Sequence, residues 1–201
     1  MNNFTFQRIA VVGTTSSGKS TLAQKLAQKI GADYIELDAL FWEPNWTPAQ
    51  SADFFVRVED AIQSDAWVTA GNYRLVRDLI WDRAQAVIWL DYSFPLIFWR
   101  LLMRTIRRAV TQEELWSGNR ESFWGHLKIW SEESLFHWLF KTYWRRKREY
   151  PTLFAEPGNT HLTVFHFKSP READKWLEAV ADPLRKIFTT KDTMVTKEKA
   201  L

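Results

Sequence analysis

A short glycine-containing loop between an apolar run and a helix-like segment constrains the fold of this chain more than any other feature. Residues 9–12 are Ile, Ala, Val and Val, a continuous apolar run typical of a buried parallel strand. Residues 13–20 follow directly, with the sequence Gly-Thr-Thr-Ser-Ser-Gly-Lys-Ser. From Ser20 to Ile30, leucine or isoleucine recurs every four residues, and Gly31 comes next, which predicts a helix that ends at the glycine. Residues 9–30 are therefore predicted to fold as strand, loop and helix.

Residues 13–20 match the complete pattern G-x-x-x-x-G-K-[ST], which is that of a phosphate-binding P-loop. Its glycines let successive backbone N–H groups turn toward one anion, and the helix N-terminus adds its dipole. We therefore expect the loop to hold the phosphates of ATP, with Lys19 reaching the β- and γ-phosphates and Ser20 supplying a hydroxyl to Mg²⁺. A chance match of a Gly/Ser-rich turn is the alternative, and the flanking strand and helix argue against it. The residues predicted to contact the nucleotide here are Gly13, Thr14, Thr15, Ser16, Ser17, Gly18, Lys19, Ser20 and Thr21.

Four further short apolar runs indicate more strands, at residues 34–37, 67–70, 86–90 and 162–167. Strands that alternate with helices predict right-handed βαβ units, and hence an α/β fold whose parallel sheet carries helices on both faces. After the first helix, the segments predicted to be helical are 49–64, 74–83, 96–108, 121–149 and 171–187, with loops at 44–48 and 111–120.

Ligands of such sheets bind beyond the carboxyl ends of the strands. Five notable residues stand at the predicted strand ends, and we expect them to converge on one edge of the sheet: Gly13, Asp38, Gly71, Asp91 and Lys168.

Composition narrows the class of protein. Hydrophobic residues make up 46% of the chain and charged residues 25%, as in ordinary globular domains. The net charge of +3 does not by itself indicate a nucleic-acid partner. The chain has no cysteine, and its four histidines lack metal-ligand spacing, so no metal other than Mg²⁺ is expected. Without a signal-peptide pattern or an apolar run of about 18 residues, we expect a cytoplasmic protein outside the membrane.

Four further motifs give the chain a resemblance to a known family. They are Leu37–Trp42, Gly71–Tyr73, Glu114–Glu121 and His166–Pro170. With the P-loop, they resemble the adenylate kinase-like family of small P-loop kinases, which includes nucleoside monophosphate, shikimate and gluconate kinases. Within that family, the group of DNA topology modulation proteins (FlaR-like) is the most similar, from about residue 6 to residue 180.

The resemblance implies a domain organisation. Five strands are expected in the order 2-3-1-4-5, in a kinase-like domain at residues 1–188. An acceptor-binding segment at about 38–65 follows the second strand, and a lid at about 107–120 follows the fourth. Residues 189–201 are polar and are expected to form a flexible tail.

The resemblance also implies further nucleotide-binding residues. Arg100 and Arg104 follow Asp91 at nine and thirteen residues, like the two arginines of the adenylate kinase helix that meets the adenine face and the phosphates. Residues four apart share one helix face, and a guanidinium can both stack on a base and bind phosphate. A solvated basic face is the alternative. Lys168 follows the fifth strand, where family members shape the adenine pocket, although Ser169 also fits a plain helix N-cap.

A lid arginine can stabilise charge on the moving phosphoryl group. Arg107, Arg108 and Arg120 flank the predicted lid, and we favour Arg120 because Gly118 and Asn119 offer a turn beside it. An ordinary surface arginine is the alternative.

The acceptor side is expected around Asp38, because shikimate and gluconate kinases place an acid there to orient or deprotonate the acceptor hydroxyl. A loop or capping aspartate is the alternative. The other residues predicted to bind the acceptor are Phe41, Trp42, Gly71 and Arg74.

Two departures from nucleotide kinases bear on the acceptor. Many of those kinases carry an acid where this chain has Ala70, and an arginine where it has Phe41. The missing arginine favours a neutral or weakly charged hydroxyl compound over a nucleoside monophosphate, with an acidic metabolite as the alternative.

The basic run Arg145–Arg148 has three interpretations: a solvated helix end, a site for an acceptor phosphate, or a nucleic-acid contact.

The sequence as a whole predicts an ATP·Mg²⁺-dependent phosphotransferase with a small-molecule acceptor, as a monomer or a homodimer. A nucleic-acid-binding or regulatory P-loop protein is the alternative, although nucleic acid is not the expected partner.

Overall fold

The structure is a computed structural model that describes residues 4–111, 114–119 and 135–180. Its centre is a five-stranded parallel sheet with strand order β2-β5-β1-β6-β7. In sequence order this is the predicted arrangement 2-3-1-4-5, and the predicted α/β fold is confirmed. The strands are β1 (Arg8–Gly13), β2 (Asp33–Glu36), β5 (Trp67–Ala70), β6 (Ala86–Leu90) and β7 (Thr163–Phe167).

Two hydrophobic cores cover the two faces of the sheet, because successive side chains of β1 point to opposite sides. Ile9 and Val11 pack against the side formed by α1, α5 and α8, whereas Ala10 and Val12 pack against the side formed by α3 and α4. The second half of α7 joins the latter core through Tyr150. The helices are α1 (Lys19–Ile30), α3 (Ser51–Ala61), α4 (Arg77–Arg83), α5 (Phe94–Thr111), α7 (Leu135–Phe154) and α8 (Pro170–Ala179).

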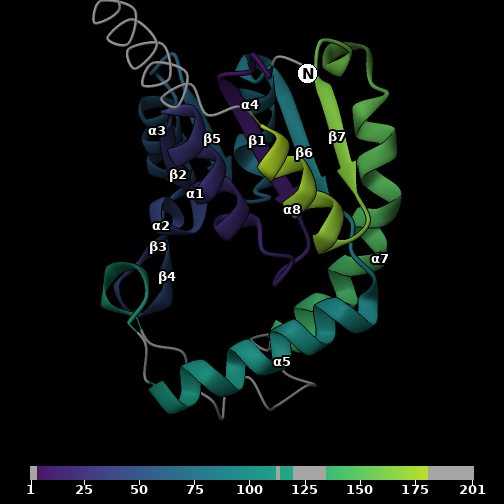
Figure 1. The fold of residues 1–201 in the computed structure, drawn as a ribbon. Coiled ribbons are helices and arrows are strands. Elements are labelled where there is room, and N and C mark those ends of the chain that lie inside the picture. Colours follow the sequence, from purple (N-terminus) through teal and green to yellow (C-terminus); the bar gives the residue numbers. More distant parts are fainter. Residues whose placement is uncertain (1–3, 112–113, 120–134, 181–201) are drawn as a thin grey trace, which may run out of the picture.

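Helix α5 crosses the molecule below the carboxyl ends of the strands (Figure 1). A small hairpin follows α2 (Leu37–Phe41) in the chain. It is formed by β3 (Trp42–Glu43) and β4 (Thr47–Pro48) around the 3₁₀ turn η1 (Pro44–Trp46). The predicted loop at 44–48 was therefore wrong in part, because the chain reverses there as a paired hairpin. The short turn η3 (Trp116–Gly118) lies within the predicted loop 111–120 and contacts this hairpin.

The second strand was predicted to run through residue 37, but β2 ends at Glu36 and the short helix α2 (Leu37–Phe41) follows. Buried Leu37 lies so close to Gly71 that a Cβ at the glycine would be 2.7 Å from the Leu37 Cβ. This contact draws the chain under the end of β5, so Asp38 lies in the first turn of a helix and not at a strand end.

Other boundaries differ by a few residues. Residues 74–76 form the 3₁₀ turn η2 (Arg74–Val76) before α4, and α5 begins before residue 96 because Pro95 is tolerated in a first helical turn. Helix α7 continues past the predicted end at 149 and contains Pro151. Residues 121–134 of the predicted helix, residues 181–187 and the predicted tail lie outside the described residues. None of the helices that the structure describes combines the length and apolar character needed to cross a membrane.

Candidate active site

The phosphate loop has the predicted position between β1 and α1. Gly13 has a φ of 151°, and a Cβ there would lie 2.7 Å from the carbonyl oxygen of Leu90. Gly18 has a φ of 94° at the N-cap of α1. Both positions therefore require glycine for backbone reasons. Among the described residues, the buried hydroxyls of Ser16 and Ser17 have no hydrogen-bond partner, so they fit a phosphate ligand.

Lys19 lies at the start of α1, and its Nζ donates to the carbonyl oxygen of Thr14 at 3.1 Å. The pKa of Lys19 is lowered to about 8, mainly by burial and next by the charge of Arg146, while Asp38 and Glu36 act in the opposite direction. Arg104 also contributes to the lowering. The surroundings of this ammonium group disfavour its charge until an anion binds.

The end of β2 brings an acid beside the P-loop serine. Burial raises the pKa of Glu36, whereas hydrogen bonds from Ser20 and Tyr34 counteract part of this rise. The Tyr34 hydroxyl donates to Glu36 Oε2. Glu36 was not among the residues predicted from the sequence, although an acid at the last position of a parallel strand was a usable signal. Its carboxylate and the Ser20 hydroxyl are oxygen ligands of the kind that Mg²⁺ prefers.

Asp38 is held in place by Tyr73, whose hydroxyl donates to Asp38 Oδ1 at 2.6 Å. Burial raises the pKa of Tyr73, and the charge of Asp38 and this hydrogen bond raise it further. The tyrosine therefore remains a donor and orients the carboxylate. The charge of Asp38 also acts on the pKa of Lys19, so the acid predicted for the acceptor and the lysine predicted for the phosphates lie within range of each other's charge.

Asn72 clamps the beginning of the phosphate loop. Its Oδ1 accepts from the Gly13 N–H at 3.0 Å, and its Nδ2 donates to the Gly13 carbonyl. The Tyr150 hydroxyl donates to the same Oδ1 at 2.9 Å. The sequence motif Gly71–Tyr73 contained this asparagine without indicating its role, and the neighbouring Gly71 packs against Leu37.

The two predicted arginines of α5 lie beside the loop. The Arg100 Nη1 donates to the Ser17 carbonyl at 3.1 Å, and its guanidinium lies over the Tyr92 ring at 5.6 Å. Arg104 is half-buried and close enough for its charge to act on Lys19. The structure therefore places Arg100 against the P-loop and Arg104 within range of the Lys19 charge, and the binding of ATP by both arginines stays a prediction.

Arg146 is the member of the basic run that joins this site. Burial lowers the pKa of Arg146, whereas Asp38 is among the charges that raise it. Within the part of the chain that the structure describes, its guanidinium forms no hydrogen bond or ion pair. A largely buried, unpaired guanidinium is costly, which fits a place that an anion occupies.

The neighbours of Arg146 have other partners. Arg145 Nε lies 3.6 Å from Glu149 Oε1, and Lys147 Nζ lies 3.1 Å from Asp91 Oδ1. Local sequence could not separate these residues, because the four basic positions are adjacent.

Other predicted residues lie outside this cluster. Arg74 is exposed at the start of η2. Phe41 packs edge-on against Phe54 at 5.1 Å and lies 4.6 Å from Tyr73, so its ring fills the base of the acceptor segment. Trp42 packs against Trp46 at 5.6 Å in the hairpin.

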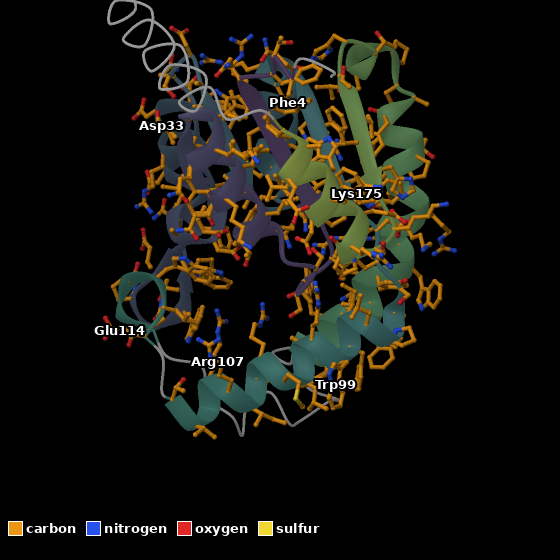
Figure 2. The ribbon with its side chains drawn as sticks, viewed as in Figure 1. Phe4, Asp33, Trp99, Arg107, Glu114 and Lys175 are labelled. Carbon is orange, nitrogen blue, oxygen red and sulfur yellow. The ribbon has the colours of Figure 1, made fainter. Side chains whose placement is uncertain are left out.

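Lys168 is exposed and lines an open cavity of about 540 Å³ with Trp89, Lys147 and His166. Its N–H donates to Glu172 Oε2 at 2.9 Å, and Ser169 caps α8, as the capping interpretation predicted. Arg120 lies outside the described residues. Arg107 and Glu114, labelled in Figure 2, mark the later part of α5 and the loop beside the hairpin.

Comparisons with known proteins bear on the fold and on the class of protein. No protein-family model matches the chain. It is 27% identical over 136 residues to shikimate kinases of Synechococcus elongatus and Synechococcus sp., matches that cover 56% of this chain and 70% of each relative.

Two solved structures share the fold. Shikimate kinase from Acinetobacter baumannii in complex with shikimate has a TM-score of 0.50 and 16% identity, covering 93% of this chain and 96% of that one. Shikimate kinase from Bacteroides thetaiotaomicron has a TM-score of 0.50 and 14% identity, with 92% and 99% covered. The fold is that of a P-loop kinase, and the sequence similarity supports a small-molecule kinase.

Proposed function

We propose that this protein is an ATP-dependent kinase that transfers the γ-phosphoryl group to a hydroxyl of a small acidic metabolite. The observation that carries the proposal is that Asp38, fixed by the Tyr73 hydroxyl at 2.6 Å, lies within range for its charge to act on Lys19, as do the charges of Arg104 and Arg146. A hydroxyl that lies between the acid and the phosphate loop is oriented for attack on the phosphoryl group.

On the nucleotide side, the loop N–H groups, the Ser16 and Ser17 hydroxyls and Lys19 bind the phosphates. Arg100 stabilises the loop by donating a hydrogen bond to the Ser17 carbonyl, and Arg104 neutralises charge on the phosphates. Asn72 holds the backbone at Gly13, so the loop keeps its shape before ATP arrives.

Mg²⁺ bound at this site would supply positive charge to balance the charge of the phosphates. Ser20 and Glu36 would hold it, since their oxygens lie together and Ala70 supplies no acid from β5. Among the described residues, no group of three or more His, Asp or Glu side chains could hold a metal ion.

On the acceptor side, Asp38 accepts the hydroxyl proton while Tyr73 fixes its orientation. Arg146 binds an acidic group of the acceptor or the phosphoryl group as it moves. The unpaired state of Arg146 favours an acidic acceptor over the neutral compound that the sequence favoured. Similarity to shikimate kinases supports a hydroxy acid.

The alternative function, nucleic-acid binding related to the DNA topology modulation group, is not favoured by the comparisons. Geometry also weakens it, because Arg145 and Lys147 have acidic partners and Arg146 belongs to the candidate site. The basic run is therefore not one row of cations facing solvent.

The test is a phosphotransfer assay with γ-labelled ATP·Mg²⁺ and a panel of shikimate, gluconate, other hydroxy acids, nucleosides and nucleoside monophosphates. We expect turnover of a hydroxy acid, and a decrease in kcat of about 10²–10⁴-fold in Asp38→Asn, the range for loss of a general base. The matched control is Asp33→Asn, which removes an exposed carboxylate from β2, the strand that precedes α2. Equal turnover in Asp38→Asn and wild type, or transfer to AMP alone, would contradict the proposal.

A further inference from the structure

The five-residue loop Leu115–Asn119, here called the docking loop, is closed on itself. The Leu115 N–H donates to the Asn119 carbonyl at 2.7 Å, and the Asn119 N–H donates to the Trp116 carbonyl at 3.1 Å. This loop lies against the hairpin Trp42–Pro48, here called the aromatic hairpin (Figure 1). The rings of Trp116 and Trp46 meet edge to face at 6.5 Å.

Asn119 joins the two segments through both ends of its amide. Its Oδ1 accepts from the Trp46 N–H at 2.8 Å, and its Nδ2 donates to the Glu43 carbonyl at 2.8 Å. Glu43 and Trp46 are three residues apart, so these two backbone groups are the pair that closes an ordinary four-residue turn. The amide of Asn119 bonds to both members of that pair. Asn119 is only 4% exposed, whereas Ser117 and Gly118 beside it are exposed.

The hairpin needs such a partner because its backbone is unusual. Asn45 has a φ of 61° and Trp46 a φ of 54°, two successive left-handed residues that are not glycine. Residues in this region persist where the surrounding structure determines them. Ser117 adds a third contact, since its hydroxyl donates to the Trp42 carbonyl at 2.8 Å.

The two segments belong to opposite sides of the candidate site. The docking loop follows α5, which carries Arg100 and Arg104 on the nucleotide side. The aromatic hairpin follows α2, which carries Asp38, and the Ala49 N–H bonds to the Phe41 carbonyl at 2.8 Å to close the base of the hairpin on that helix. Contacts from Asn119 therefore link the loop that comes after α5 in the chain to the hairpin that follows α2.

We infer that Asn119 is a positioning residue that holds the aromatic hairpin in shape and couples it to nucleotide binding on α5. Asn119 does not touch the reacting atoms. It acts through the backbone of Glu43 and Trp46, and so through the place of Trp42 and Trp46 beside the acceptor. The coupling part of this inference rests on the proposed kinase function, whereas the positioning part does not.

Hydrogen–deuterium exchange of the full chain tests both parts. In Asn119→Ala without nucleotide, we expect the amides of residues 42–48 to exchange at least about tenfold faster than in wild type, because a lost hydrogen bond makes local opening easier. The matched control is Asn159→Ala, which removes another amide hydrogen bond, 2.8 Å to the Leu153 carbonyl, away from the hairpin. It should leave residues 42–48 unchanged.

The second arm adds a non-hydrolysable ATP analogue with Mg²⁺. In wild type the analogue should slow exchange at residues 13–20 and also at 42–48. In Asn119→Ala it should slow only residues 13–20. Asn119→Asp retains an oxygen for the Trp46 N–H but loses the donor to Glu43, so it should give an intermediate result, and it decides the matter if the alanine variant does not fold.

Three results of the exchange experiment would contradict different parts of the inference. Unchanged exchange at 42–48 in both Asn119 variants overturns the positioning role. Equal protection of 42–48 by the analogue in wild type and variants overturns the coupling. If the analogue fails to protect residues 13–20 in wild type, the proposed kinase function and the coupling fail together, while exchange without nucleotide still decides the positioning role.

Discussion

Lys19 carries a charge that its surroundings disfavour. Burial is the main cause of its lowered pKa, and the guanidinium of Arg146 adds to it. Arg146 is itself largely buried, and its pKa is lowered mainly for the same reason. Two cations held close together in this way favour an anionic ligand more strongly than either would alone.

This arrangement predicts proton uptake when ATP binds. The pKa of Lys19 falls from 10.5 to about 8 on folding. Between these values the unfolded chain binds more protons, so the contribution of this group to stability rises with pH from about 8 to 10.5. A bound phosphate favours the charged lysine, so ATP binding just above pH 8 should take up protons, and affinity should fall as pH rises further.

Calorimetric titration in two buffers of different ionisation enthalpy measures this uptake. Lys19→Met should bind ATP more weakly and remove the uptake that Lys19 causes. Identical proton uptake in wild type and variant would show that another group is responsible.

We predict that replacing Arg146 affects stability and activity in opposite ways. Arg146→Met removes an unpaired, largely buried charge, so the melting temperature should stay the same or rise. Turnover should fall by about 10²–10³-fold, the usual cost of losing one donor to developing charge. The exposed Arg148→Met is the matched control and should change neither quantity. A lower melting temperature in Arg146→Met alone would indicate a structural role instead.

Helix α5 shows how one element can serve packing and chemistry together. Ile97 and Leu101 are fully buried in the core, while Arg100 bonds to the P-loop from the same stretch. Arg104 follows one turn later, so the packing of the helix sets the position of both guanidinium groups. The docking loop then ties the region beyond its end to the aromatic hairpin.

For this element we predict that Arg104→Ala lowers kcat more than it raises the KM for ATP. A contact with the transferring phosphoryl group strengthens in the transition state, so its loss appears mainly in kcat. Steady-state kinetics measure the two constants, with Lys175→Ala on α8 as an exposed control (Figure 2). A structure with an ATP analogue bound and both Arg100 and Arg104 turned to solvent would refute the assignment.

At the scale of the whole molecule, some basic residues belong to the candidate site and others form ion pairs with nearby acids. The net charge is only +3. Lys147 bonds to Asp91, which also accepts from His166 at 3.0 Å when that ring nitrogen carries a proton. Cations engaged in this way are less available to a polyanion.

We therefore predict negligible sequence-specific DNA binding. Weak, nonspecific binding should fade as salt increases, because it depends on counterion release. Fluorescence anisotropy with labelled duplexes at several salt concentrations provides the measurement. Nanomolar, sequence-dependent affinity at physiological salt would contradict the prediction and revive the nucleic-acid-binding alternative.

Much of the fold, and the place of the phosphate loop within it, followed from local pattern. The run at 9–12, the glycine spacing at 13–20 and the alternation of strands with helices determined the parallel sheet and the place of the phosphate loop. These features depend on residues close in sequence and on right-handed chain connections, so the sequence reveals them. The end of β2 was misjudged, because its cause is the packing of Leu37 under Gly71.

Other roles were decided only by tertiary structure. Asn72 reaches Gly13 across 59 positions, Asn119 reaches Trp46 across 73, and Tyr150 reaches Asn72 across 78. Arg145, Arg146 and Arg148 are alike in sequence, and only the folded structure shows that Arg146 is the one whose charge acts on Lys19. Sequence by itself determined where a phosphate can bind, because that requires one contiguous loop. The tertiary structure decided which distant side chains complete the site, because burial and long-range contacts exist only after the chain has folded.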